Sequence, residues 1–66
     1  MNITLNGEAF SFTSGTSISE LLKTLDLEVE KVAIERNMEI LPRSLYDNTH
    51  LIDGDNLEIV HFIGGG

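Results

Sequence analysis

The chain has 66 residues, of which 11 are acidic, 4 are basic and none is cysteine, giving a formal net charge of −7. This length allows a single domain, and the absence of cysteine excludes disulfides, thiolate nucleophiles and cysteine metal sites. The acidic balance argues against a nucleic-acid partner, which needs Lys and Arg to neutralise phosphates, and leaves two interpretations open: solubility, or docking on a basic protein surface.

Residues 1–13 carry the pattern of a β-hairpin. Met1, Ile3 and Leu5 alternate with polar residues, as in a half-buried strand. The pair Asn6-Gly7 that follows is preferred in two-residue type I′ turns, where both central residues need positive φ. The turn therefore predicts that Ile3 lies opposite Phe10, with the apolar residues of both strands on one face.

The next segment predicts one short amphipathic helix. Ser17 and Glu20 have the spacing of a capping box, in which each side chain satisfies a backbone N–H at the helix start. Leucines and an isoleucine then recur at helical spacing and form one apolar stripe: Ile18, Leu21, Leu22 and Leu25. The helix is expected to end near residues 25–26.

The second half of the chain predicts short strands separated by irregular stretches. One strand is centred on residues 32–34, and Ile40-Leu41 pairs briefly before Pro42, which favours a sheet edge or an exit. Asp53-Gly54-Asp55 marks a tight bend before the last strand. These elements predict an α+β fold, a mixed sheet with the helix packed on one face.

Catalytic and metal-binding patterns are weak in this sequence. No serine lies in a nucleophile-elbow context, and neither His50 nor His61 has a ligand partner at helical spacing, so no catalytic residue and no metal site are predicted. The terminal glycines do not form a phosphate-binding loop, because no helix and no Walker lysine follow them. The sequence favours a protein that is not an enzyme.

The end of the sequence, "EIVHFIGGG", suggests a different role. Glycine lacks Cβ, so an extended segment of Gly64, Gly65 and Gly66 can pass through a narrow channel and present a terminal carboxylate. If the preceding strand turns Leu57 and Ile59 towards the helix, its other face carries Val60 and Phe62, an apolar patch suited to a partner protein. The alternatives are a fraying terminus or cloning remnant for the glycines, and an irregular stretch folded over the patch.

The pattern as a whole resembles the sulfur carrier family of thiamine biosynthesis. The resemblance spans nearly the full chain and is most specific in "VAIERN", "LPRS" and "LIDGDNLEIV" running into the terminal glycines. It implies a ubiquitin-like β-grasp domain over residues 1–63 and a flexible glycine tail over residues 64–66. One departure is Leu45-Tyr46 after the Pro-Arg pair, where Tyr46 supplies the expected aromatic residue.

The resemblance also implies a reaction and its participants. The carboxylate of Gly66 is adenylated by an E1-like adenylyltransferase and is then converted to a thiocarboxylate with sulfur from a donor. The thiocarboxylate delivers this sulfur to thiazole synthase. ATP and Mg²⁺ are used by the activating partner, and no cofactor is bound by the carrier. A molybdopterin synthase type of carrier and a non-covalent β-grasp binding module remain as alternatives.

The location of the protein is predicted from two absences in the sequence. Residues following Met1 show neither a basic segment nor an apolar core of a secretory signal, and no apolar run is long enough to span a bilayer. We therefore expect a cytoplasmic protein with no membrane partner.

Overall fold

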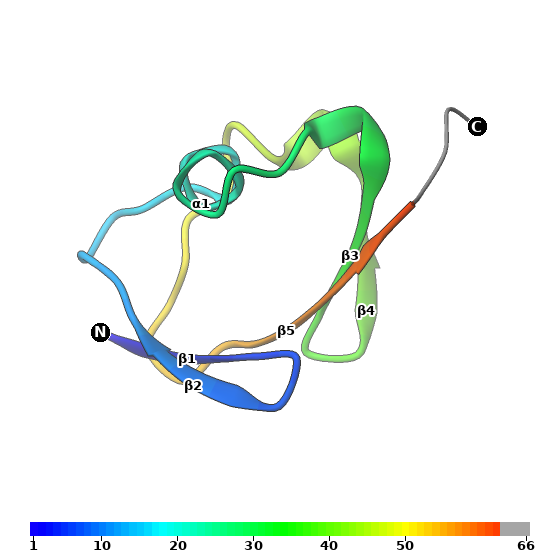
Figure 1. The fold of residues 1–66 in the computed structure, drawn as a ribbon. Helices are drawn as coiled ribbons and strands as arrows, with labels where there is room; N and C mark the ends of the chain where they lie inside the picture. Colours follow the sequence, from blue (N-terminus) through cyan, green and yellow to red (C-terminus); the bar gives the residue numbers. More distant parts are fainter. Residues whose placement is uncertain (63–66) are drawn as a thin grey trace.

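The computed structural model describes residues 1–62, in which strands and one α-helix form a single layered unit (Figure 1). In chain order the elements are β1 (Asn2–Leu5), β2 (Glu8–Ser11), α1 (Ile18–Thr24), β3 (Val32–Arg36), β4 (Glu39–Leu41) and β5 (Asn56–His61). Single turns of 3-10 helix, η1 (Val29–Lys31) and η2 (Arg43–Leu45), precede β3 and follow β4. The predicted tail, residues 64–66, and the last residue of the predicted domain lie outside the described residues.

The strands form one mixed sheet in the order β2-β1-β5-β3-β4. β1 pairs antiparallel with β2 and parallel with β5, while β3 pairs antiparallel with both β4 and β5. The strand that comes last in the chain therefore lies in the middle of the sheet, between the two hairpins (Figure 1). The predicted α+β arrangement, a mixed sheet with one helix on one face, is confirmed.

The first hairpin has the predicted register. Leu5 lies opposite Glu8 and Ile3 opposite Phe10. Asn6 and Gly7 have φ values of 50° and 82°, the positive pair that a type I′ turn requires. The local sequence is thus sufficient to set this half of the sheet.

The predicted capping box starts α1. The Ser17 hydroxyl accepts from the Glu20 N–H at 3.1 Å, and the Glu20 carboxylate accepts from the Ser17 N–H at 3.0 Å. The helix ends with Leu25 as its C-cap, followed by Asp26 at a φ of 57°, a left-handed conformation that stops the helix.

The capping box makes part of the stability depend on pH. Hydrogen bonds from the backbone and hydroxyl of Ser17 lower the pKa of Glu20 below its ordinary value of 4.5. The stability contributed by this carboxylate is therefore fully present above pH 4.5 and is lost as the pH falls through the lowered folded-state pKa. Glu20→Gln keeps the capping hydrogen bond without the charge. Urea unfolding of both chains should show the wild type more stable above pH 4.5 and the difference narrowing below it. A difference that stays constant with pH would contradict this assignment.

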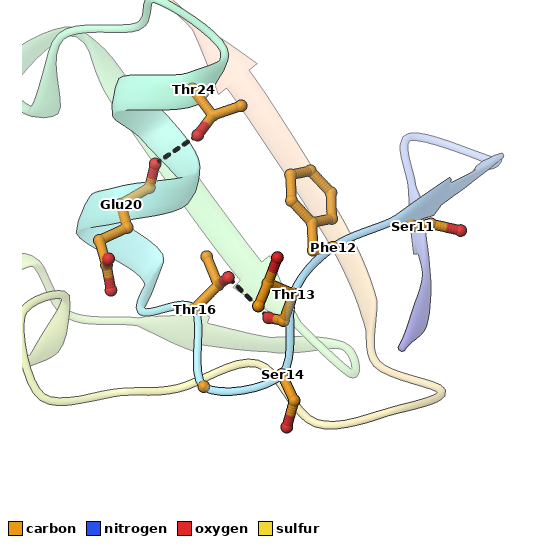
Figure 2. Close-up of a pocket in the computed structure, with 8 residues that line it drawn as sticks. Ser11, Phe12, Thr13, Ser14, Thr16, Glu20 and Thr24 are labelled. Carbon is orange, nitrogen blue, oxygen red and sulfur yellow. Dashed lines mark hydrogen bonds between the residues drawn. The ribbon is translucent and has the colours of Figure 1, made fainter.

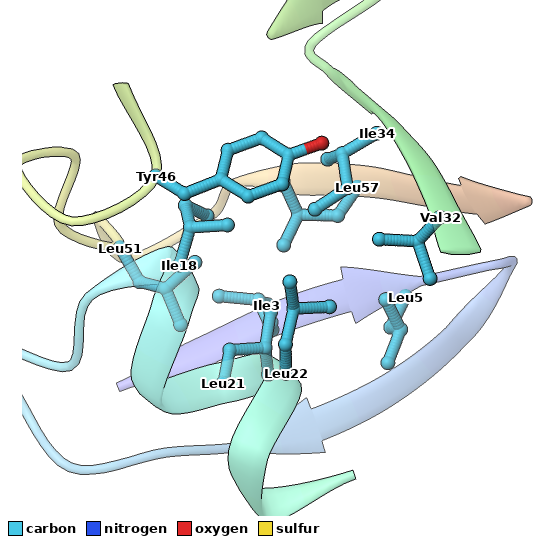
Figure 3. Packing of buried hydrophobic residues seen from close by; sticks show 10 residues of the cluster. All are labelled: Ile3, Leu5, Ile18, Leu21, Leu22, Val32, Ile34, Tyr46, Leu51 and Leu57. Atoms are coloured by element: carbon cyan, nitrogen blue, oxygen red, sulfur yellow. The ribbon is translucent and has the colours of Figure 1, made fainter. Parts of the chain in front are cut away.

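The core lies between α1 and one face of the sheet, as Figure 3 shows. It joins residues from the helix, from the three strands β1, β3 and β5, and from the irregular stretch before β5. Its members are Ile3, Leu5, Ile18, Leu21, Leu22, Val32, Ile34, Tyr46, Leu51 and Leu57. Burial raises the pKa of the Tyr46 hydroxyl, which is the aromatic side chain that the irregular stretch supplies.

The irregular stretch before β5 packs on the helix side of the sheet. Leu51 and Tyr46 belong to the same core as α1, and two backbone hydrogen bonds tie the stretch to the helix start: Ile18 N–H to Thr49 at 2.9 Å and Leu51 N–H to Thr16 at 2.8 Å. The alternative in which this stretch covers the opposite face of the sheet is therefore wrong.

Candidate functional site

The last strand turns its two faces to different surroundings. Leu57 is fully buried against α1 and Ile59 packs beside the core, whereas Val60 is 59% exposed and Phe62 is 46% exposed. The sequence left open whether Val60 and Phe62 are exposed or covered, and the structure shows both exposed. Their role in binding a partner is a separate hypothesis that the fold makes possible.

Val60 belongs to an apolar surface on the side of the sheet away from α1. It lies directly opposite Ala33 on β3, and Ile40 on the neighbouring β4 is 79% exposed. These residues line a shallow hollow of about 70 Å³. We call the apolar side chains Ala33, Ile40, Val60 and Phe62 the open face.

The open face is bordered by negative charge. Glu35 and Glu58 lie directly opposite each other on β3 and β5, and both are exposed. Like charges in this position repel. Three of the chain's four basic residues are engaged elsewhere: Lys31 with Glu28 at 3.1 Å, Arg36 with Asp55 at 3.1 Å, and Arg43 with the backbone oxygens of Glu30 and Val32. The fourth, Lys23, lies on α1. The arrangement suits a partner surface that is apolar and basic.

The end of the open face is fixed to the sheet by its backbone. The Phe62 N–H donates to the Lys31 carbonyl at 2.7 Å, one residue beyond the Val32–His61 pair. Residue 62 is the last that the structure describes, so the proposed working residues Gly64, Gly65 and Gly66 lie outside it. The described part of the chain therefore ends at an anchored strand end beside the open face, and in the sequence Ile63 and the three glycines come next.

The start of β5 is held by a buried carboxylate that sequence reasoning missed. Asp55 is only 4% exposed, and its side chain accepts from Arg36 Nε at 3.1 Å, Asn37 Nδ2 at 3.2 Å and the Ile52 N–H at 2.8 Å. From the local sequence, Asp55 is expected only to form part of the Asp-Gly-Asp turn. Its burial depends on an arginine that precedes it by 19 residues.

A second unpredicted contact lies in the middle of β5. The Asn6 side chain, at the tip of the first hairpin, accepts from the Ile59 N–H at 2.8 Å and donates to the Ile59 carbonyl at 3.2 Å. It thereby continues the connection between the hairpin and β5 beyond the short parallel pairing of β1, which ends at Leu5 and Leu57.

A hollow lies on the helix side, between the end of β2 and α1, and Figure 2 shows the side chains around it. Its volume is about 690 Å³, and hydroxyl groups with one carboxylate, Glu20, dominate its lining. No histidine or lysine lines it. Across residues 1–62, no three His, Cys, Asp or Glu side chains gather as metal ligands would. In the same residues, no helix has the length and apolar character needed to cross a bilayer.

Comparison with known proteins decides the family. The model of the ThiS family matches residues 3–66, almost the whole chain. The chain belongs to the ThiS family.

Relatives within the ThiS family match this chain over nearly their full length. Sulfur carrier protein ThiS of Bacillus subtilis is 43% identical over 63 residues, covering 94% of this chain and 96% of that protein. Sulfur carrier protein ThiS of Escherichia coli is 32% identical and covers both chains completely.

A solved structure matches the fold. The crystal structure of the thiamine biosynthesis protein ThiS from Geobacter metallireducens superimposes with a TM-score of 0.84 at 38% identity, covering both chains fully. The expected ubiquitin-like β-grasp fold is thereby confirmed.

Larger proteins also contain a segment similar to this chain. The thiazole synthases of Paramagnetospirillum magneticum and Magnetococcus marinus are 47% and 46% identical over all 66 residues. The chain spans only 20% of the length of each of these relatives.

Proposed function

We propose that this chain is a sulfur carrier for thiamine biosynthesis, a protein co-substrate and not an enzyme. The observation that carries the proposal is that the ThiS family match extends from residue 3 through the glycines to Gly66. Two relatives of matching length bear the name sulfur carrier protein ThiS.

The chemistry that we propose takes place at the Gly66 carboxylate. A carboxylate oxygen attacks the α-phosphorus of ATP and pyrophosphate leaves, so the glycine becomes an acyl-adenylate. A sulfide equivalent from the donor then attacks the acyl carbon and AMP leaves, which produces the thiocarboxylate. Activation splits one difficult substitution into two easier steps. ATP and Mg²⁺ bind in the site of the E1-like adenylyltransferase and not on this chain. We propose that both reaction steps take place in the cytoplasm.

We further propose that the thiocarboxylate is delivered to thiazole synthase. Support comes from the two thiazole synthases that contain a segment 47% and 46% identical to this chain. A carrier-like segment and a named thiazole synthase share one polypeptide in those proteins, which is the arrangement expected if the two act in sequence.

Intact-mass spectrometry tests the proposal directly. Incubation with an E1-like adenylyltransferase, ATP, Mg²⁺ and a sulfur donor is expected to replace one carboxylate oxygen of Gly66 by sulfur, and fragmentation should place the change on that residue. An unchanged mass beside a relative that the same enzyme charges would reject a carrier role and favour a non-covalent binding module. Rescue of molybdopterin but not thiamine synthesis would assign the carrier to the other pathway.

The open face is the surface by which we propose that the carrier docks on its activating partner. Val60→Asp places a negative charge in the middle of this apolar surface. It is expected to slow thiocarboxylate formation at Gly66, here called charging, about tenfold, the loss typical of a central interface residue. The matched control is Ile52→Asp, because Ile52 is 60% exposed, close to the 59% of Val60, and lies before the opposite end of β5. Initial charging rates of both variants at limiting enzyme provide the measurement. Equal rates for the two variants would remove Val60 from the interface.

A further inference from the structure

The outer edge of β2 is a free sheet edge with a hollow beside it. Within residues 1–62, β2 pairs with β1 alone and ends the sheet on that side. The proposed charging reaction uses neither this edge nor the hollow. β2 lies across the molecule from the C-terminal end of β5 (Figure 1).

The hydrogen bonds of the first hairpin show which backbone groups face outward. Met1 and Phe12 exchange two bonds, at 2.9 and 3.0 Å, and are therefore a hydrogen-bonded pair. Such pairs alternate along an antiparallel ladder. Ala9 and Ser11 fall at the intervening positions, so their N–H and C=O groups point away from β1.

The other side of β1 provides an independent check. Ala9 lies opposite Thr4, and the Thr4 N–H donates to the Asp55 carbonyl at 2.8 Å, towards β5 and away from β2. Ser11 lies opposite Asn2, whose N–H and C=O likewise bond to Asp53 and Gly54. Two residues on β2 therefore present donor and acceptor pairs, at the spacing of an extended chain, that bond to no other residue among 1–62.

The side chains beside this edge are apolar on the helix side. Phe10 lies opposite the core residue Ile3 and is 36% exposed, and its ring centroid is 6.3 Å from that of Phe12. Phe12 stands at the hollow, with Glu20 and Thr24 on the neighbouring helix (Figure 2). A strand added to β2 would thus place every second side chain against two aromatic rings and the wall formed by α1.

Charge decides what kind of strand fits. Glu20 is the charged residue that lines the hollow, and Glu8 stands at the opposite end of β2. A second copy of this chain would bring Glu8 and a net charge of −7 to the same edge, so like charges oppose self-pairing. An incoming lysine or arginine would be attracted instead.

We propose that the β2 edge binds an extended segment of another protein by strand addition. The segment carries an apolar side chain and a lysine or arginine two residues apart, so that both face α1. Backbone hydrogen bonds to Ala9 and Ser11 provide the affinity, while Phe10, Phe12 and Glu20 select the side chains.

A capped synthetic peptide, Thr-Val-Thr-Lys-Thr-Val-Thr, serves as the probe, titrated at up to millimolar concentration into the ¹⁵N-labelled full chain. The amide signals of Ala9 and Ser11 are expected to shift and to exchange more slowly with solvent. N-methylation of the peptide at its pairing positions should weaken binding about tenfold through the lost backbone hydrogen bonds. This comparison leaves the protein unaltered, so it does not depend on the folding of a variant.

Two variants of the chain test the same interaction by altering the protein and not the peptide. Ala9→Pro removes one outward N–H without removing a bond to β1 and should weaken binding about fivefold. Glu20→Gln keeps the capping box and should weaken binding about threefold, an effect that high salt removes. Both variants should be charged at Gly66 at the wild-type rate, which separates this proposal from the carrier function.

Several results would overturn the proposal. No binding at millimolar peptide, shifts confined to the open face, or equal affinity for a peptide with glutamate in place of lysine would each reject it. Sedimentation of the free chain as a dimer that Ala9→Pro dissociates would assign the edge to a second copy instead.

Discussion

Deletion of Gly66 is expected to reduce thiocarboxylate formation at least about 100-fold. The terminal carboxylate then belongs to Gly65 and is displaced from the position where it reacts, and a misplaced reacting group slows a reaction by a factor of this size. One residue of extended chain spans about 3.3–3.6 Å, so the remaining carboxylate falls short of the site where ATP is attacked. In the part of the chain that the structure describes, the ten buried apolar residues all lie between Ile3 and Leu57. The deletion should therefore leave the free energy of unfolding unchanged.

The companion variant adds one glycine after Gly66. It preserves every residue of the chain but moves the carboxylate outward by the same length, and we expect the same loss of charging. Intact-mass spectrometry with the activating enzyme measures charging, and urea unfolding measures stability. Charging of either variant at the wild-type rate would mean that the position of the terminal carboxylate is not what the partner recognises.

Asp55→Ala is expected to have the largest effect on stability. Removing the carboxylate leaves the Arg36 guanidinium and the Ile52 N–H without their acceptor, and breaking such a buried ion pair costs about 3 kcal/mol. A chain of this length has a total stability of about 3–10 kcal/mol. The variant should therefore be substantially unfolded at moderate temperature, as urea titration followed by the fluorescence of buried Tyr46 would show.

Two controls separate the ion pair from a general effect of losing charge. Glu58→Ala removes an exposed carboxylate from β5 and should change the stability by less than about 0.5 kcal/mol. The double variant Arg36→Met, Asp55→Ala removes both charges and should be more stable than Asp55→Ala alone, since no uncompensated cation remains. A double variant no better than the single one would assign the loss to the contacts of Asp55 with Ile52 and Asn37.

The features predicted from sequence are those set by neighbours in the chain. Asn6-Gly7 determines a turn whose positive φ values fix the register of β1 and β2, and Ser17 with Glu20 determines where α1 begins. The two faces of β5 followed from alternation, since Leu57 is buried and Val60 exposed. In the hairpin and at the start of α1 two local signals agreed, and in β5 the alternation alone indicated which residues share a face.

The features that could not be predicted depend on residues far apart in the sequence. Nothing near Asn56 or Leu57 indicates that β5 pairs parallel with β1, because a strand's pattern does not name its neighbour. From the local sequence Asp55 is expected to be a turn residue, yet its buried carboxylate accepts from Arg36 and Asn37, which precede it by 19 and 18 residues. The free edge of β2 likewise appears only when the strand order is known.

Because β5 lies in the centre of the sheet, the sheet can form only after residues 56–61 have been synthesised. During synthesis, the hairpin of β1 and β2, the helix and the hairpin of β3 and β4 all leave the ribosome before the strand that joins them. A chain cut before Asn56 has two half-sheets and no shared centre, and folding must wait for contacts between distant segments. Such a fragment would lack both the fold and the surface beside Val60. If the proposed activating partner docks on the open face, prematurely terminated chains would lack the surface that it recognises.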